Sequence, residues 1–316
     1  MSKQAFLFPG QGSQYVGMAE KILERVPGAS RFLEEASDLL HMDLGRLIGK
    51  VPGEERCGPL FQDTGSQLAI FVANAIYWSV WRDRGPRPWA VTGYSLGFYS
   101  ALMAAEVFDL SKGLTMVQEA GRMVGEASRL RPGNMAAVIG LSEREVLEIC
   151  QEVQEKGFAG VANFNASNQM VISGDREAVK AACSLALARG ALGAKEIRAQ
   201  AAYHSPLMEL PSRQFADFLE GIPLEDPRLP VLSYLDAQYV STGQEAREVL
   251  SRHLKSQTRW GDCIERLVGE GVDTFIEVGP GQVLSRLTRW INRGVTCYAT
   301  DDDEVLSRLL EGRGLD

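Results

Sequence analysis

The alternation of short apolar runs with amphipathic helical segments constrains this sequence more than any other feature. Such alternation is typical of an α/β protein, in which helices connect buried parallel strands. With 316 residues, the chain is long enough for one large domain and a smaller one. Five apolar runs predict strands of a single parallel sheet flanked by helices: 5–8, 90–94, 230–235, 274–278 and 295–299.

Residues 133–199 follow a different order. The pattern there predicts a strand, a helix, a hairpin of two strands, a second helix and a final strand at 194–200. Ser142, with Glu145 three residues later, predicts a capped start for the first of these helices. A βαββαβ order is the ferredoxin-like signature. We therefore expect residues 133–199 to form a small ferredoxin-like subdomain, inserted into a large hydrolase-like α/β domain made of 1–132 and 200–316.

Charge and composition argue against several classes of function. A net charge of −8 disfavours a nucleic-acid partner, because phosphate backbones are bound by clustered Lys and Arg. No segment approaches 18 uninterrupted apolar residues, so we expect no membrane span, and the first apolar stretch is too short for a signal peptide. The five cysteines are scattered and lack CxxC spacing. They indicate reduced packing residues in a cytoplasmic protein, with no metal site.

The segment AVTGYSLGFYSAL (90–102) places Ser95 between Gly93 and Gly97, where a strand-like run passes into a helical one. A G-x-S-x-G match is weak alone, but strand–turn–helix is the setting that a nucleophile elbow requires. The glycines would allow the sharp turn, and the helix N-terminus would direct N–H groups toward an oxyanion. The alternative is a Gly-Ser-Gly turn without chemistry. The context favours the elbow.

A serine nucleophile needs a base, and the chain has three histidines. His41 stands at helical spacing among leucines, which indicates packing or capping. His253 lies in a helical stretch, where an exposed or bridging role is expected. His204, in QAAYHSPLM, is the best candidate for the base, although spacing alone leaves a structural role open.

Six stretches keep the order and spacing of one family over nearly the whole chain: FPGQGSQYVGM (8–18), GYSLGFYSAL (93–102), GNMAAVIGL (133–141), NFNASNQMVISGD (163–175), YHSPLM (203–208) and EVGPGQVLSRL (277–287). They resemble the malonyl-CoA:acyl-carrier-protein transacylases and the acyltransferase domains of polyketide synthases. The resemblance implies transfer of an acyl group, malonyl by default, from coenzyme A to the phosphopantetheine thiol of an acyl carrier protein. It implies an acyl-CoA substrate and no cofactor. We also expect a monomer.

The resemblance further implies a Ser–His dyad. Ser95 would attack the thioester carbonyl, and His204, oriented by main-chain carbonyls in place of a carboxylate, would take its proton. The main-chain N–H groups of Gln11 and Leu96 would bind the oxyanion. Without the resemblance, the PGQGSQ segment around Gln11 would be interpreted as a phosphate loop or a plain turn.

The sequence departs from the family's pattern around the nucleophile. Tyr94 and Phe98 stand where members usually carry His and Glu. His253 stands where members commonly carry a glutamine. We expect Tyr94, Phe98, Ala120 and Tyr203 to line the acyl pocket.

The largest departure concerns the acyl group. Ala120 stands where malonyl-specific members carry an arginine, whose guanidinium binds the free carboxylate bidentately. Arg122 is two residues further along the helix, so it is rotated away by about 200°. An arginine such as Arg122 or Arg198 could substitute only from a different backbone position.

Three functions stay open at this stage. The first is acyl transfer to a carrier protein, with malonyl as the default. The second is a transferase or hydrolase for acyl groups that lack a free carboxylate, which Ala120 favours. The third is a non-catalytic interaction protein, against which the retained Ser95, His204 and Gln11 argue.

Overall fold

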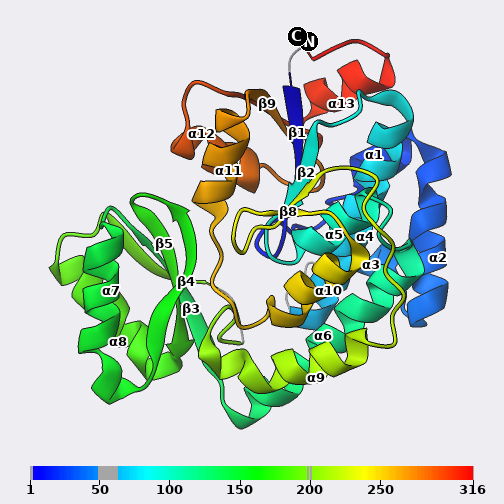
Figure 1. Cartoon of the computed structure of the whole chain (residues 1–316). Helices are drawn as coiled ribbons and strands as arrows, with labels where there is room; N and C mark the ends of the chain where they lie inside the picture. The colour runs from blue at the N-terminus through cyan, green and yellow to red at the C-terminus, as the bar shows by residue number, and fades with distance from the viewer. Residues whose placement is uncertain (1–2, 49–62, 198, 200, 316) are drawn as a thin grey trace.

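A six-stranded sheet forms the centre of the molecule, with strand order β10-β9-β1-β2-β7-β8 (Figure 1). The computed structural model describes residues 3–48, 63–197, 199 and 201–315. All neighbours in this sheet pair in parallel except β7 and β8. The strands are β1 Lys3–Phe8, β2 Ala90–Gly93, β7 Val231–Leu232, β8 Tyr239–Val240, β9 Val272–Glu277 and β10 Thr296–Ala299.

The predicted parallel sheet flanked by helices is therefore confirmed, with two differences. The run 230–235 is a strand only over Val231–Leu232, and the antiparallel edge strand β8 was not predicted. A strand of two residues carries no recognisable alternation of apolar and polar residues, so the sequence gives no signal for it.

Eleven α-helices surround this sheet in the described part of the chain. Helices α4, α5 and α6 pack against one another, and α5 also contacts β1 and β2. On the other side, α11 and α12 contact β9. These eleven helices are α1 Glu20–Arg25, α2 Ser30–Leu40, α3 Leu44–Ile48, α4 Asp63–Arg84, α5 Gly97–Ala104, α6 Leu110–Leu130, α9 Glu209–Leu219, α10 Gly243–Arg252, α11 Trp260–Gly269, α12 Val283–Ile291 and α13 Asp303–Leu310.

A second, four-stranded antiparallel sheet lies beside the first, in green in Figure 1, with strand order β4-β5-β3-β6. Its elements follow the predicted order of strand, helix, hairpin, helix and strand. They are β3 Gly133–Ile139, α7 Glu143–Glu152, β4 Ala159–Ala166, β5 Gln169–Asp175, α8 Arg176–Ala188 and β6 Gly193–Ile197. Ser142 and Glu145 form the predicted capping box at the start of α7. Arg198 and Gln200, in the predicted strand 194–200, lie outside the described residues.

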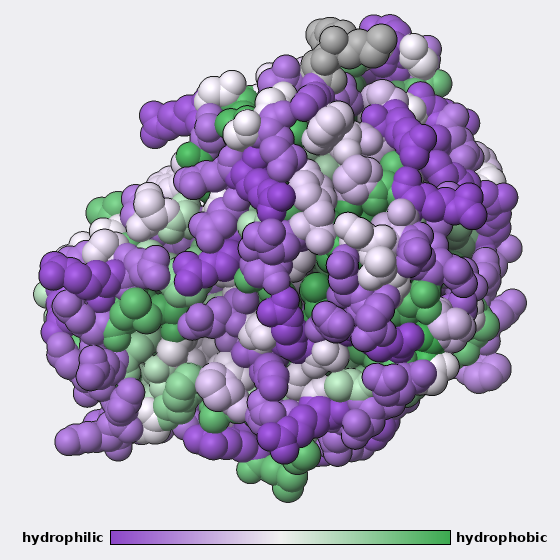
Figure 2. All heavy atoms as spheres, viewed as in Figure 1, coloured by the Kyte–Doolittle hydropathy of each residue, from purple (hydrophilic) through white to green (hydrophobic). Residues whose placement is uncertain are grey.

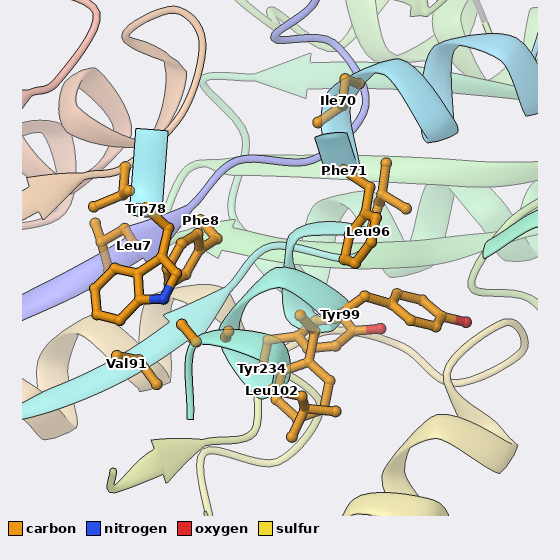
Figure 3. Packing of buried hydrophobic residues seen from close by; sticks show 14 of the residues in the cluster. Leu7, Phe8, Ile70, Phe71, Trp78, Val91, Leu96, Tyr99, Leu102 and Tyr234 are labelled. Carbon is orange, nitrogen blue, oxygen red and sulfur yellow. The ribbon is translucent and has the colours of Figure 1, made fainter. Parts of the chain in front are cut away.

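Each sheet has its own hydrophobic core. In the larger core, shown in part in Figure 3, Phe8 of β1 meets Trp78 of α4 edge to face, with ring centroids 6.0 Å apart. Leu96, Tyr99 and Leu102 belong to the same cluster, so the start of α5 is anchored in the core. The second core fills the space between the four-stranded sheet, α7 and α8.

The surface and the cysteines agree with the composition. The face seen in Figure 2 is mostly hydrophilic, with apolar residues in small separate patches. Within the described ranges, no helix is long and apolar enough to cross a membrane. Cys150, Cys183, Cys263 and Cys297 are buried free thiols, whereas Cys57 lies outside the described residues.

The junction between β2 and α5 is built from close contacts of main chain on main chain. A Cβ atom on Gly97 would lie 2.0 Å from the carbonyl oxygen of Phe8, and one on Gly93 would lie 2.0 Å from the carbonyl oxygen of Gly97. A Cβ on Gly10, in the loop after β1, would lie 2.3 Å from the carbonyl oxygen of Tyr94. Only glycine fits at these three positions without movement of the backbone.

We expect Gly97→Ala to lower the free energy of unfolding by about 3 kcal/mol or more, because the backbone of β1 cannot yield as a side chain would. Gly125→Ala in α6 is the matched control. A Cβ there meets nothing within 4 Å, so this change should stabilise the protein by about 0.5–1 kcal/mol through helix propensity. Denaturant unfolding of both variants measures the difference. Equal midpoints would contradict the close packing described here.

Candidate active site

Ser95 occupies the turn between β2 and α5 in a left-handed backbone conformation, with φ at +53°. A non-glycine residue in this region is strained, and such strain is common at functional sites. The side chain is directed at His204, whose Nε2 lies 2.8 Å from Ser95 Oγ. The turn therefore has the geometry of an elbow that presents its serine to a base.

His204 follows β6 in a loop that leads to the short 3-10 helix Pro206–Met208. Its backbone is also left-handed, with φ at +58°, and its N–H donates to the carbonyl of Leu254 at 2.7 Å. The ring nitrogen Nδ1 lies 3.0 Å from the carbonyl oxygen of Ser256. Because a carbonyl only accepts, Nδ1 carries the proton and Nε2 is left to accept from Ser95. A main-chain carbonyl thus orients the imidazole.

Burial keeps His204 neutral. The side chain is buried, and desolvation lowers its pKa to about 4, against the opposing effect of hydrogen bonds to the carbonyls of Ser256 and His253. The imidazole is therefore the free base throughout the neutral pH range. Such a group can take a proton from Ser95 without first losing one.

Gln11 and Leu96 lie beside the dyad and line the same cavity as Ser95. Leu96 is the N-cap residue of α5, and the close packing of Gly10 on the elbow brings Gln11 next to it. Within the described residues, neither main-chain N–H donates a hydrogen bond to another group. Both donors are therefore available to a ligand.

A narrow cavity leads from Ser95 toward α6. One face of α6 contributes Val117, Ala120 and Val124 to its wall, at helical spacing. Of the described residues that line it, none is Lys or Arg. The described residues that line it are Gln11, Gln67, Ser95, Leu96, Tyr99, Val117, Ala120, Val124, Tyr203, His204, His253 and Leu254.

Of the two arginines considered as substitutes for one at position 120, Arg122 does not reach the cavity. Arg122 is half exposed and its guanidinium pairs with Glu119 and Glu126 on the outer face of α6. The rotation expected from helix geometry is therefore confirmed, and Arg122 is excluded from the cavity. Arg198 lies outside the described residues.

A larger cleft opens on the other side of Ser95, between the two sheets. Tyr94 lines it, donates from its hydroxyl to Asn165 Oδ1 at 2.8 Å, and packs edge to face on Trp260. Asn163, from β4 of the smaller sheet, also lines this cleft. The cleft is mixed in character, with amide and hydroxyl groups next to Met135, Val171 and Ile197.

The expectation for Phe98 was wrong, and the expectation for His253 was right only in part. Phe98 lines neither cavity, because the second residue of α5 points into the core, where its ring packs on Tyr234 with centroids 5.3 Å apart. His253 is not exposed, but it does bridge two residues, because its two ring nitrogens lie within reach of the Tyr99 and Tyr234 hydroxyls. It is buried, lines the narrow cavity, and its Nε2 lies 2.8 Å from the Tyr99 hydroxyl. By contrast His41 is exposed at the C-cap of α2, as a capping role predicts.

Gln67 is a site residue that the sequence did not reveal. It lies in the second turn of α4, directly before an apolar stretch, and its amide nitrogen donates to the Tyr203 hydroxyl at 2.9 Å and to Gln11 Oε1 at 3.3 Å. The only signal in the sequence was an amide among buried helical residues. Within the described residues, no group of three His, Cys, Asp or Glu side chains could hold a metal ion.

A family model described as an acyl transferase domain matches residues 5–299. The chain belongs to the acyl transferase family. This acyltransferase is 34% identical to the malonyl CoA-acyl carrier protein transacylase of Bacillus subtilis (strain 168), over 98% of the chain and 97% of that protein. It is also 34% identical to the protein of the same name in Escherichia coli (strain K12), over 98% and 100%. Polyketide biosynthesis protein ThaF of Burkholderia thailandensis matches at 36% over 92% of the chain and 24% of its own length.

Solved structures agree with this assignment. The acyltransferase superposes on PlMCAT, a malonyl-transacylase solved in complex with the type II PKS acyl-carrier protein AntF, with a TM-score of 0.93, 33% identity and coverage of 99% and 100%. An acyl carrier protein S-malonyltransferase of Vibrio cholerae gives a TM-score of 0.89 at 32% identity, with coverage of 98% and 100%.

Titration of His204 tests the electrostatics of the site directly. With three histidines in the chain, imidazole C2–H resonances can be assigned by single His→Gln variants. We expect the His204 resonance to titrate with a midpoint near pH 4, as the lowered pKa requires. A midpoint close to the ordinary histidine value of about 6.5 would mean that the ring is more hydrated than the packing indicates.

Proposed function

We propose that this acyltransferase moves an acyl group from coenzyme A to the phosphopantetheine thiol of an acyl carrier protein through an acyl-serine intermediate. The observation that carries the proposal is the 2.8 Å contact between Ser95 Oγ and His204 Nε2 in a strained strand–turn–helix junction. Malonyl is the default acyl group, since relatives that match over the whole chain are named malonyl CoA-acyl carrier protein transacylases.

In the first half of the reaction, Ser95 Oγ attacks the thioester carbonyl while its proton moves to His204 Nε2. The tetrahedral intermediate then collapses, the C–S bond breaks, and His204 returns the proton to the departing thiolate. In the second half, the carrier thiol loses its proton to His204 and attacks the acyl-serine ester. The C–O bond breaks and Ser95 regains its proton. No cofactor takes part, because the coenzyme A thioester is itself the substrate.

The main-chain N–H groups of Gln11 and Leu96 donate hydrogen bonds to the oxyanion of each tetrahedral intermediate and stabilise its negative charge. Both residues line the cavity at Ser95 and both donors are unused within the described residues. Leu96 also precedes the first turn of α5, where the helix dipole favours an anion. Fixed main-chain donors need no rearrangement as the charge develops.

The larger cleft suits the phosphopantetheine arm that coenzyme A and carrier proteins share. Its amide and hydroxyl groups match the amides of the arm, and its apolar side chains match the methylene segments. The cleft lies between the two sheets, which we assign to a large domain of 1–132 and 200–316 and a ferredoxin-like subdomain of 133–199. A carrier protein as partner is supported by the solved PlMCAT–AntF complex. The monomeric state and the cytoplasmic location stay predictions.

A second candidate function follows from Ala120, namely transfer or hydrolysis of acyl groups that lack a free carboxylate. Ala120 lies in the wall of the narrow cavity, and the described lining contains no Lys or Arg. A carboxylate moved into such a cavity loses several kcal/mol of hydration unless a cation compensates it. Hydrolysis and transfer differ in the final acceptor, so release of free acid against loading of a carrier protein separates them.

Substitution of Ser95 and substitution of His204 should affect formation of the acyl-enzyme differently. Ser95→Ala should give no acyl-enzyme adduct by intact mass with any acyl-CoA, while keeping the fold. His204→Ala should still form the adduct, but 10²–10⁴-fold more slowly, which is about the usual contribution of a positioned base. Equal rates for His204→Ala and the parent protein would remove His204 from the mechanism.

The acyl group can be identified by competition between malonyl-CoA and acetyl-CoA for Ser95 at pH 8. We expect acetyl-CoA to compete effectively, because nothing fixed in the described cavity lining offsets the malonyl charge. Ala120→Arg should shift the preference toward malonyl. A strong malonyl preference in the unmodified protein would contradict the second candidate and leave malonyl transfer as the function.

A further inference from the structure

His253 is placed at the acyl cavity by the end of α10. It is the C-cap residue of that helix, its side chain is buried, and it lines the same cavity as Ser95 and Ala120. The imidazole packs edge to face on Tyr99, with ring centroids 5.2 Å apart, and also contacts Phe215. A helix C-terminus is a position that favours a cation.

The hydrogen bonds of His253 are compatible with both a neutral and a protonated imidazole, so the group bound in the cavity can determine its protonation state. Nε2 lies 2.8 Å from the Tyr99 hydroxyl, and Nδ1 lies 3.5 Å from the Tyr234 hydroxyl. A phenol can donate or accept. Tyr99, which also lines the cavity, can therefore accept from a protonated imidazole and turn its own O–H toward an acyl group. The neutral and the cationic ring both keep their partners.

Among the described residues, no carboxylate lies against the His253 ring. The titratable side chains against His253 in the described structure are Tyr99 from α5, Tyr234 from the turn after β7, and His204, with no carboxylate among them. Burial, and then the proximity of His204, lower the pKa of His253 to about 3. An empty cavity, or one that holds a neutral acyl group, therefore leaves the ring uncharged.

A carboxylate in the cavity favours the protonated form of His253, because an opposite charge a few ångströms away raises the pKa of a buried imidazole. His204 cannot serve as that cation, because its Nε2 must stay free to take the Ser95 proton. The described lining has no other group that can become positive.

We propose that His253 is the specificity-determining residue of the acyl cavity. It stays neutral beside an uncharged acyl group, and it takes up one proton from solvent when an acyl group with a free carboxylate, such as malonyl, occupies the cavity. The inference rests on the proposed acyl-serine function. Proton uptake by His253 makes the rate of Ser95 acylation by malonyl-CoA depend on pH. The rate of acylation by acetyl-CoA depends only on those groups of the enzyme that act on both substrates.

The test is the ratio of malonyl to acetyl acylation of Ser95, measured by intact mass in competition from pH 8 down to pH 5. In this range His204 is neutral, and any effect of its titration divides out of the ratio. The ratio should rise as the pH falls, by up to about tenfold for each pH unit, which is the limit for uptake of one proton. An arginine would give a flat ratio, because it stays charged throughout.

Two variants test whether His253 is the group that takes up the proton. His253→Gln keeps a hydrogen-bonding side chain but cannot be protonated, so its ratio should not change with pH, whatever the absolute rates. His41→Gln makes the same change at the exposed end of α2 and should keep the slope of the parent protein. A flat ratio in the parent protein, or a slope that survives in His253→Gln, would overturn the proposal. Absence of any acylation would instead contradict the acyl-serine function itself.

Discussion

The site depends on the contact between the backbone of β1 and the first turn of α5. Gly97 lies so close to the Phe8 carbonyl that no side chain fits between them, and Gly10 lies nearly as close to the Tyr94 carbonyl. These contacts fix the left-handed Ser95 between them and bring the loop that carries Gln11 to the start of the helix. The nucleophile and the two proposed oxyanion donors are thus held by main chain, which cannot change rotamer. Strain at Ser95 is maintained by the surrounding core.

The base is fixed in an equally rigid way. The N–H of His204 and its Nδ1 bond to the carbonyls of Leu254 and Ser256, so the tautomer follows from the backbone and needs no carboxylate. A buried carboxylate would raise the pKa of the imidazole, whereas a carbonyl leaves it low. The consequence is a base that is already neutral at physiological pH. The same burial extends to His253, so both imidazoles are neutral, and the described residues that line the acyl cavity carry no fixed positive charge.

Much of this arrangement could be predicted from the sequence, because it depends on local patterns. The strand–turn–helix context of Ser95, the capping box at Ser142 and four of the five strand runs each express one short-range rule, and the structure agrees; the run 230–235 is a strand over two residues only. Phe98 was wrongly assigned to the pocket, and His253 is buried rather than exposed, because the directions of both side chains depend on how α5 and α10 pack, which helical spacing does not determine. Gln67 was missed because a single amide in an apolar helix has no motif. Which residues share the acyl cavity with Ala120 is a property of tertiary packing and appears only in the structure.

The central claim is that the acyl group passes through Ser95. The most direct measurement is a brief exposure to an acyl-CoA, followed by proteolysis and mass spectrometry of the peptides, with and without a carrier protein added before quenching. The account predicts one acylated peptide, with the acyl group on Ser95, which disappears as the carrier gains the same mass. An acyl group found on another residue, or a carrier that is loaded while Ser95 is never modified, would contradict it.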